Sequence, residues 1–335
     1  MKKLILFLLS LFLITGCSTS SVPSNTDQFT NLREIHFIDT GNSDCTLIHG
    51  ENFNVLIDGG DRDDKDMLVD YLKSLNITTI DYLISTHPDA DHCGSLATIV
   101  NNFTIKNAFV CNDKANTKTY QSFIQALSNI GLNPSVPLEN NTFYLDDDIS
   151  LTFYNTKSKA NNSNDLSLIT LYQDHQKRFL FTGDASYDVI ENYTGQIGTI
   201  DVLKVSHHGS YTGTSESMIW SLQPKIAVIE CGKDNSYGHP HQETLDILNA
   251  YDVEILRTDQ LGTIILNTDG NTVEQSTVST KTTNTEKYIG NTSTLKYHLA
   301  SCDHLPSKDH QIVFNTTKEA TQAGYEACKK CFKNT

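Results

Sequence analysis

Residues 86–92 read Thr-His-Pro-Asp-Ala-Asp-His and hold four potential metal ligands within six positions. An apolar run typical of a buried strand precedes them and a helical pattern follows, so the ligands occupy a strand-to-helix turn. Proline and alanine alternate with the ligands, which lets the turn direct several donors at one point. This density indicates half of a two-metal site, with His87 and Asp89 binding one ion and Asp91 and His92 the other. The alternative is a solvated acidic turn.

The ligand spacing resembles the H-x-[HD]-x-D-H signature of the metallo-β-lactamase-fold hydrolases, in the variant with aspartate at the second metal position. The resemblance implies an α/β (α+β) fold, an αββα sandwich, with two divalent metal ions that activate a hydroxide for hydrolysis. The remaining ligands must then come from other parts of the chain.

The segment before the motif predicts three short strands and an amphipathic helix within residues 34–75. In the resembled family such a βββα unit opens the fold and carries an aspartate–glycine turn near the site. Two turns here fit that pattern, one at Asp39 and one at Asp58. We expect Asp58 to orient a metal ligand rather than to bind metal itself. A plain turn carboxylate is the alternative.

Two later strand ends supply further ligands. The turn Thr-Gly-Asp at 182–184 resembles the bridging aspartate of the family, so Asp184 would be shared by both ions. The pair His207 and His208 follows another predicted strand and precedes a glycine that leaves room for substrate. We expect His207 to be the metal ligand and His208 to position the substrate or support a ligand, with the reverse assignment open.

A loop at 235–241, Asn-Ser-Tyr-Gly-His-Pro-His, contributes His239. Its position is not spaced like a chelate with any neighbour, so we expect it to hold a substrate phosphate or donate a proton. A structural histidine is the alternative. Asp91, His208 and His239 are therefore the candidates for direct action on the substrate.

One departure from the family bears on the metal. Members that hydrolyse β-lactams or thioesters place a further histidine between the first motif and the bridging aspartate, but here the only histidine between His92 and His207 is His175, in a predicted hairpin. We do not expect His175 to be a ligand. One ion would then be bound mainly through oxygen, by His87, Asp89 and Asp184 with Asn164 or Ser167 nearby. Oxygen-rich coordination makes manganese a serious competitor to zinc.

These motifs occur in the same order as in the C-terminal hydrolase domain of the ComEC family of competence proteins, over roughly residues 33–269. The resemblance implies a nuclease or other phosphodiesterase that acts on DNA. No run of membrane helices that could form a DNA channel is expected in this chain.

Composition supports a folded enzyme with a local rather than a general attraction for phosphate. The 335 residues, 38% of them hydrophobic, fit one large domain with a small appendage. Forty acidic against 25 basic residues give a net charge of −15, which opposes a general polyanion-binding surface. Metal ions would have to attract any phosphate substrate.

The N-terminus predicts a processing signal. A positive start and a short apolar core end in Ile-Thr-Gly-Cys, which resembles a bacterial lipoprotein signal at residues 1–17 with Cys17 as the lipidated residue. Residues 18–32 have the composition of a flexible tether. We therefore expect a lipid anchor in the cell membrane, with the protein on the extracytoplasmic face; simple secretion is the alternative.

After a hydrolase domain at 33–270 and a Thr/Asn-rich linker at 271–286, residues 287–335 resemble the small metal-binding domain of the Ada DNA-repair proteins. The pattern His298-x3-Cys302 with Cys328-x2-Cys331 predicts one structural zinc, which a unit of this size needs for stability. A Cys328–Cys331 disulfide is the alternative. Histidine stands where Ada has its methyl-accepting cysteine, so methyl transfer is not expected.

From Lys281 onward eight lysines and five acidic residues give +3, which is consistent with holding nucleic acid. The other cysteines, Cys45, Cys93, Cys111 and Cys231, are either buried thiols or partners in disulfides. The expected function is a membrane-anchored extracellular phosphodiesterase or nuclease acting on DNA. The alternatives are a small-molecule hydrolase of lactonase or β-lactamase type and a non-catalytic DNA-capture lipoprotein.

Overall fold

The computed structural model describes residues 32–113, 115–276, 288–299, 302, 304–314, 320–321 and 323–331. The predicted signal with Cys17 and nearly all of the predicted tether lie outside these residues. No helix in the described ranges is both long and apolar enough to cross a lipid bilayer. The four cysteines without close-pair spacing, Cys45, Cys93, Cys111 and Cys231, are buried free thiols.

The first sheet has seven strands in the order β14-β13-β1-β2-β3-β4-β5. The strands are β1 (Arg33–Phe37), β2 (Thr46–His49), β3 (Asn54–Ile57), β4 (Thr79–Ser85), β5 (Thr104–Val110), β13 (Ile264–Thr268) and β14 (Val273–Gln275). β3, β4 and β5 are parallel, and the other pairs are antiparallel.

β14 extends this sheet past residue 270, into the segment that the sequence had suggested as linker. The backbone reverses there because Asp269 Oδ1 accepts hydrogen bonds from the N–H groups of Asn271 and Thr272, which allows residues 273–275 to pair with β13.

The second sheet also has seven strands, in the order β12-β11-β10-β9-β8-β7-β6. The strands are β6 (Thr142–Asp146), β7 (Ile149–Tyr154), β8 (Ile169–Asp174), β9 (Lys177–Phe181), β10 (Val202–Lys204), β11 (Ile226–Ile229) and β12 (Glu254–Arg257). β9 to β12 are parallel, whereas β6 to β9 form antiparallel hairpins.

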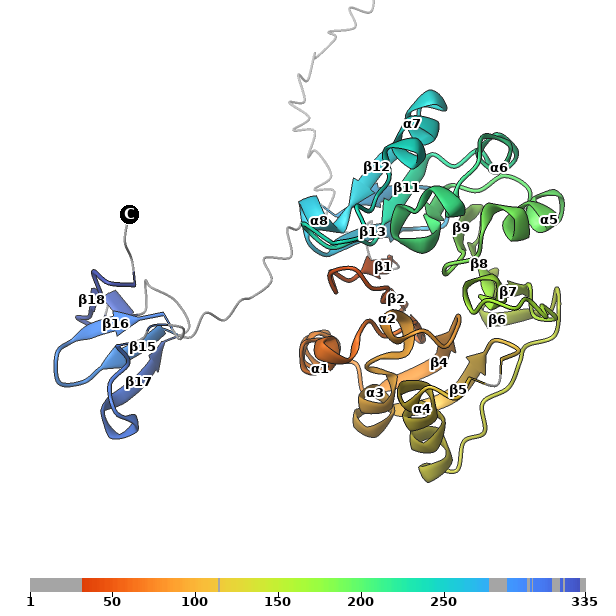
Figure 1. Ribbon diagram of the computed structural model, residues 1–335. Helices are drawn as coiled ribbons and strands as arrows, with labels where there is room; N and C mark the ends of the chain where they lie inside the picture. Colours follow the sequence, from red (N-terminus) through yellow and green to blue (C-terminus); the bar gives the residue numbers. More distant parts are fainter. Residues whose placement is uncertain are drawn as a thin grey trace, which may run out of the picture.

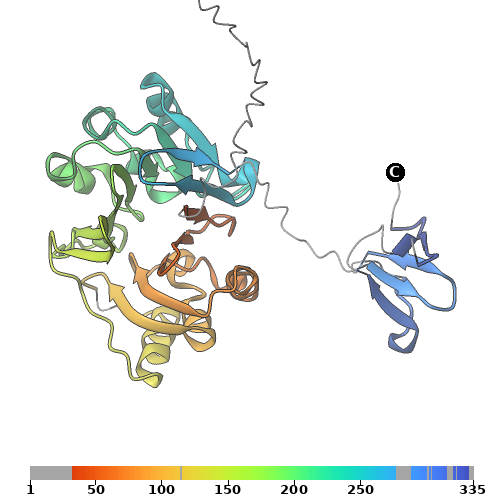
Figure 2. The ribbon, with the colours of Figure 1, turned by 180° about the vertical axis from the view of Figure 1, so that it is seen from behind.

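Helices cover the outer face of each sheet, as Figures 1 and 2 show from opposite sides. On the first sheet these are α1 (Lys65–Ser74), α3 (Leu96–Asn102) and α4 (Lys118–Asn129); on the second they are α5 (Tyr187–Ile197), α6 (Glu216–Leu222) and α7 (Gln242–Ala250). Shorter helices are α2 (Ala90–Cys93), α8 (Thr258–Leu261) and the 3₁₀ turns η1 (Arg62–Asp64), η2 (Asn164–Leu166), η3 (Ser206–Gly209), η4 (Tyr211–Gly213) and η5 (Lys308–His310).

The strand sequences dictate this layering because successive side chains point to opposite faces. In β2, Ile48 enters the core between the sheets and Leu47 the core under the helices of the first sheet. In β9, Phe179 and Phe181 enter the central core and Leu180 the core under the helices of the second sheet. The predicted αββα sandwich is therefore confirmed.

The C-terminal unit is a four-stranded sheet of order β17-β15-β16-β18. Its strands are β15 (Tyr288–Asn291), β16 (Lys296–His298), β17 (Gln311–Phe314) and β18 (Glu326–Ala327). Its described core consists of four buried residues, Tyr297, Phe314, Ala320 and Tyr325.

Candidate functional site

The site lies where parallel strands of both sheets end. Asp58 follows β3, residues 86–92 follow β4, and Asp184 follows β9. The pair His207 and His208 follows β10. Parallel neighbours end at the same edge of a sheet, so segments far apart in the sequence meet there.

Asp184 lies at the centre of four imidazole rings. The Nε2 atom of His92 is 3.2 Å from Asp184 Oδ1. The Nε2 atoms of the other three, His87, His207 and His208, are 3.9, 3.7 and 3.9 Å from Asp184 Oδ2. One carboxylate therefore faces imidazole nitrogens on both of its oxygens, which is the arrangement expected of a bridging ligand.

The donor atoms themselves have the chemistry of metal ligands. His87 Nε2, His92 Nε2, His208 Nε2 and Asp184 Oδ1 are buried without a hydrogen-bond partner. Buried polar atoms are rarely left unpaired, because their desolvation is costly. Since donor atoms of His92, His208 and Asp184 lie within 4.8 Å of one another and His87 Nε2 lies 3.9 Å from Asp184, the residues present fit divalent metal ions.

The two flanking aspartates divide the donors into two groups. Asp89 Oδ2 lies 3.7 Å from His87 Nε2, and Asp91 Oδ2 lies 3.4 Å from His208 Nε2. Asp91, His92, Asp184 and His208 each offer a donor atom within 4.8 Å of the others. The geometry thus supplies one group around His87 and Asp89 and a second around Asp91, with Asp184 between them.

The two histidines of the pair differ in burial and in their neighbours. His208 is buried and belongs to the second donor group, whereas the side chain of His207 is 29% exposed. Both residues have positive φ angles, 52° in each case, so the chain turns back and directs both rings toward Asp184. The alternation of side chains along the preceding strand does not predict such a turn.

Hydrogen bonds from neighbouring residues fix the donors. Asp58 accepts from the N–H and hydroxyl of Thr86 and faces His92 Nδ1 at 2.8 Å, which leaves the Nε2 of His92 directed at Asp184. Ser167 Oγ accepts from the N–H of Asp184 and lies 3.3 Å from His87 Nδ1.

Asn164 lies beside the more exposed histidine, with its Nδ2 3.4 Å from His207 Nδ1. Gly183 is required next to the bridging aspartate, because its φ is +52° and a Cβ there would lie 2.9 Å from Ser167 Oγ. His175 lies at the tip of the β8–β9 hairpin against Asp174 and Gly270, away from these donors.

Three charged residues behind the site were not found from the sequence. Asp44 Oδ1 lies 3.1 Å from His208 Nδ1, and Asp44 Oδ2 accepts from Lys204 Nζ at 2.6 Å. Glu230 lies 3.8 Å from the same amine, and its backbone carbonyl is 3.0 Å from His208 Nδ1. All three are buried. The available signal was Lys204 itself, a lysine within an otherwise apolar strand.

Electrostatics keep the central carboxylate ionised and some imidazoles neutral. Burial acts to raise the pKa of Asp184, but the imidazoles of His92 and His208 outweigh it and hold the pKa well below its ordinary value. Burial, reinforced by His92, lowers the pKa of His87 to about 4. Burial also lowers the pKa of His239 to about 4, with His208 and His207 adding to the effect.

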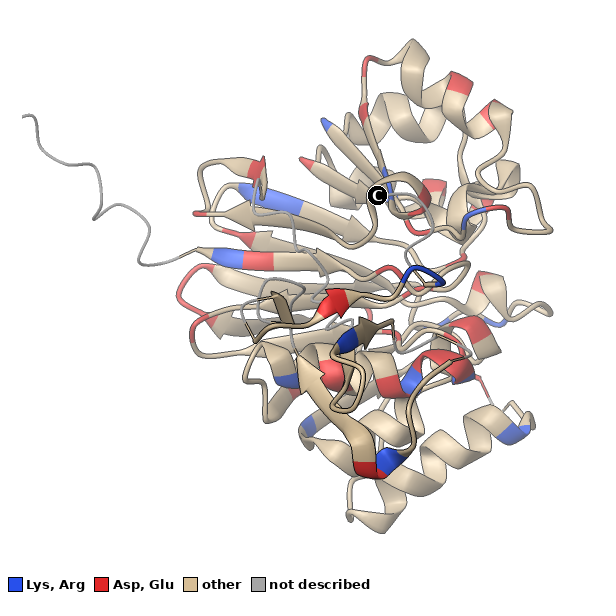
Figure 3. Ribbon diagram, turned by 90° about the vertical axis from the view of Figure 1, so that its left-hand side faces the viewer, with Lys and Arg blue, Asp and Glu red and all other residues tan. Residues whose placement is uncertain are grey.

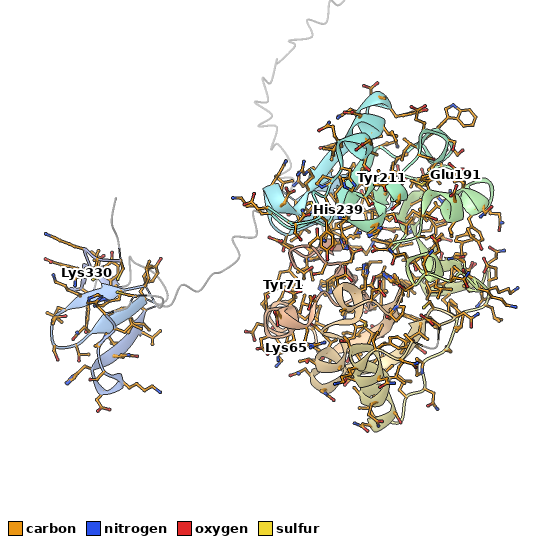
Figure 4. All side chains as sticks on the ribbon, in the orientation of Figure 1. Lys65, Tyr71, Glu191, Tyr211, His239 and Lys330 are labelled. Carbon is orange, nitrogen blue, oxygen red and sulfur yellow. The ribbon has the colours of Figure 1, made fainter. Side chains whose placement is uncertain are left out.

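A cavity of about 350 Å³ opens over the donors and is lined by Asp89, Asp91, Asp184, His207, His208 and Asn164, and by Tyr237 and His239 from the 235–241 loop. Figure 4 shows His239 near the junction of the two halves of the domain. Its ring centroid lies 5.5 Å from that of His207 and 6.2 Å from that of His208. His239 thus faces the same space as the metal donors.

The C-terminal unit brings together its own four candidates. His298, Cys302, Cys328 and Cys331 offer donor atoms within 4.8 Å of one another. His298 Nδ1 lies 3.5 Å from Cys302 Sγ and 3.7 Å from Cys331 Sγ. Three thiols and one imidazole at this spacing fit a tetrahedral zinc ion.

Comparison with known proteins identifies the families of both domains. Residues 274–334 match the metal-binding domain of Ada. The chain is 31% identical over 203 residues to ComE operon protein 3 of Bacillus subtilis, covering 59% of this chain and 26% of that protein. It is 28% identical over 243 residues to Recombination protein 2 of Haemophilus influenzae, covering 70% of this chain and 29% of that protein. The chain therefore spans about a quarter of the length of these relatives.

Among solved structures, the metallo-β-lactamase fold protein YhfI from Bacillus subtilis aligns with a TM-score of 0.47 and 10% identity, over 68% of this chain and 95% of that one. The model of the metallo-beta-lactamase superfamily matches residues 38–232, more than half of the chain. The chain belongs to the metallo-β-lactamase superfamily and carries a C-terminal Ada-type metal-binding domain.

Proposed function

We propose that this protein is a metal-dependent phosphodiesterase that cleaves DNA at the outer face of the cell membrane. The observation that carries the proposal is Asp184 with both oxygens facing imidazole nitrogens and with Asp89 and Asp91 on either side. Such a shared carboxylate suits two cations a few ångströms apart, the arrangement used to displace an oxygen at phosphorus. Two ions, zinc or manganese, would supply an activated hydroxide and polarise the phosphoryl oxygen.

The residues of the chain would bind and orient the substrate. His87, Asp89 and Asp184 would hold one ion, and Asp91, His92, His208 and Asp184 the other. His239 faces the cavity beside these donors with a pKa of about 4, so its ring is neutral at pH 7. A neutral imidazole can donate an N–H hydrogen bond to a phosphoryl oxygen.

The negative net charge of the protein is consistent with a phosphate substrate that binds only at the metal ions. The net charge is −15, and acidic residues are interspersed with basic ones on the side of the molecule in Figure 3. A phosphate would be repelled by much of this surface and attracted at the metal ions. DNA is favoured as the phosphodiester because one of the two relatives is named as a recombination protein.

The location of the protein is proposed from its N-terminus. The lipoprotein-like segment that ends at Cys17 supports anchoring by a lipid on the extracytoplasmic face, followed by the tether at residues 18–32. In the C-terminal module, one zinc ion bound by His298, Cys302, Cys328 and Cys331 would serve folding, and its lysines would help to retain DNA.

The test is hydrolysis by metal-reconstituted protein of single-stranded DNA, double-stranded DNA, RNA and a simple phosphodiester. The proposal expects cleavage of DNA with manganese at least as effective as zinc, because His87 lies in a group richer in carboxylate than in imidazole. Hydrolysis of lactones or β-lactams without cleavage of any phosphodiester would contradict it. Binding of DNA without cleavage under any metal would assign the chain to capture instead.

A further inference from the structure

Tyr237 is a large aromatic residue that remains exposed at the mouth of the cavity. Its side chain is 68% exposed, although it lines the same cavity as the metal donors. Its ring is stacked on His239, with the centroids 5.6 Å apart and the planes 21° apart. His239 is in turn nearly parallel to His208, at 6.2 Å and 25°. Three roughly parallel rings thus lead from the metal donors to the surface.

The loop that carries this tyrosine is fixed by one side chain. Asn235 Oδ1 accepts hydrogen bonds from the N–H groups of Tyr237 and His239, and Asn235 Nδ2 donates to the carbonyls of Gly232 and His239. The backbone is therefore held while the ring faces solvent. Binding a flat group on this ring would cost little ordering of the protein.

The surrounding charges restrict which flat group could bind. Asp89, Asp91 and Asp184 line the same cavity, so an additional anionic group away from the metal ions would be repelled. Asn42 also lines the cavity, and its Oδ1 is buried without a hydrogen-bond partner, which leaves an acceptor for an amino or hydroxyl group. A neutral, planar ring with N–H donors meets both conditions.

Resting on the proposed function, we infer that Tyr237 is a stacking subsite for the nucleobase next to the phosphate being cleaved. In a nucleotide, a single sugar separates phosphate from base, so a phosphate at the metal donors brings a neighbouring base into the cavity that Tyr237 lines. Base–aromatic stacking accepts every base, since each has a flat π face. The base must be unpaired, because a base inside a duplex has both faces covered by its neighbours.

The experiment compares two single-stranded substrates of equal length, oligothymidylate and an oligomer with the same sugar–phosphate backbone but without bases. Tyr237→Ala should lower kcat/KM on oligothymidylate by roughly 5- to 100-fold, the loss equivalent to one stacked base. The same variant should cleave the abasic oligomer as well as the unaltered protein does. Tyr237→Phe should retain activity on both, because stacking does not need the hydroxyl.

Tyr144→Ala is the matched control, since Tyr144 is also highly exposed, at 73%, but lies on the edge strand β6 outside the cavity. It should change neither rate. If the unaltered protein cleaves both oligomers and Tyr237→Ala slows both equally or neither, the stacking subsite is wrong and the phosphodiesterase stands. If the unaltered protein cleaves neither oligomer but does cleave double-stranded DNA or a simple phosphodiester, the subsite is wrong and the phosphodiesterase stands. If it cleaves no phosphodiester at all, both proposals fail.

Discussion

The two candidate metal sites of this chain differ in what holds their ligands in place. In the hydrolase domain His92 is fixed by Asp58 and the backbone of Asp184 by Ser167. In the C-terminal module the ring of His298 faces Cys302 and Cys331, which are themselves candidate ligands. Its Nε2 is buried with no hydrogen-bond partner among the described residues.

The hydrolase domain also has a larger hydrophobic core around its site than the C-terminal module has. Three large apolar clusters support the hydrolase domain, one between the sheets and one under each helical layer. The described part of the C-terminal module has four buried core residues. A core this small supplies at most about 3–5 kcal/mol, so such units usually need a metal or disulfide. The hydrolase domain therefore positions its own metal ligands, whereas the C-terminal module is expected to need a bound metal ion in order to fold.

The largest expected effects come from removing one ligand from each site, which should abolish catalysis in one case and folding in the other. Asp184→Asn should lower DNA cleavage on the order of 10³-fold, because it weakens the ligand that both ions share, while the domain remains folded. Cys328→Ser should do the reverse, unfolding the module while cleavage of a short oligonucleotide persists. Steady-state kinetics and NMR spectra of both variants are the measurements. Near-normal turnover in Asp184→Asn would contradict the two-metal site.

A second effect concerns the buried charges behind the hydrolase site. Lys204→Met would leave the Asp44 carboxylate buried without its ammonium partner, which should lower the free energy of unfolding by about 3–5 kcal/mol. The measurement is urea denaturation of the hydrolase domain within the full chain.

Lys225→Met is the control for this change, because Lys225 also pairs with an aspartate, Asp201 at 2.9 Å, but its side chain is 72% exposed. It should cost less than about 1 kcal/mol. Equal losses of stability in the two variants would mean that the buried ion pair behind the site contributes no more than an exposed one.

Asp58→Asn probes how the fold orients a ligand. An amide has one acceptor oxygen and cannot serve the N–H of Thr86 on one side and His92 Nδ1 on the other. Affinity for the metal ions should fall by about 10- to 100-fold. Asp39→Asn is the matched control, since Asp39 is exposed and accepts from Gly41 in its own turn. A competition titration against a chelating dye would show the difference, and identical affinities would remove the orienting role.

The smallest effect is expected from the tail. A chain that ends near residue 280 keeps every candidate ligand of the hydrolase site, so its turnover of a small phosphodiester should be unchanged. Binding of long DNA should weaken by a few-fold and depend less steeply on salt, because lysine–phosphate contacts are lost. The comparison is made at two salt concentrations. Identical affinities in both would assign the module a role other than holding DNA.

The resemblance of the ligand motifs to a known family predicted the fold class, and local sequence patterns agree with it. Alternation such as Leu47 and Ile48 marks two apolar faces, and clustered ligands at strand ends mark the edge where parallel strands meet. The glycine before Asp184 also indicates a tight turn, and Gly183 has a φ of +52°.

The parts that could not be predicted depend on contacts across the two sheets. Lys204 and Asp44 are 160 positions apart in the sequence, so the lysine in an apolar strand indicates a buried ion pair but does not identify its partner. The roles of His207 and His208 depend on two consecutive positive φ angles, which the residue types do not favour. β14 depended on a turn at Asp269 within a segment whose composition indicates a linker.

The most direct measurement is a metal titration of the full chain after removal of all metal, followed by NMR and by DNA cleavage in parallel. Signals of the hydrolase domain should be dispersed throughout, signals of the module should become dispersed only as zinc binds, and cleavage should follow occupation of the hydrolase site. A hydrolase domain that is unfolded without metal, or a module that is folded without it, would contradict the distinction between the two sites.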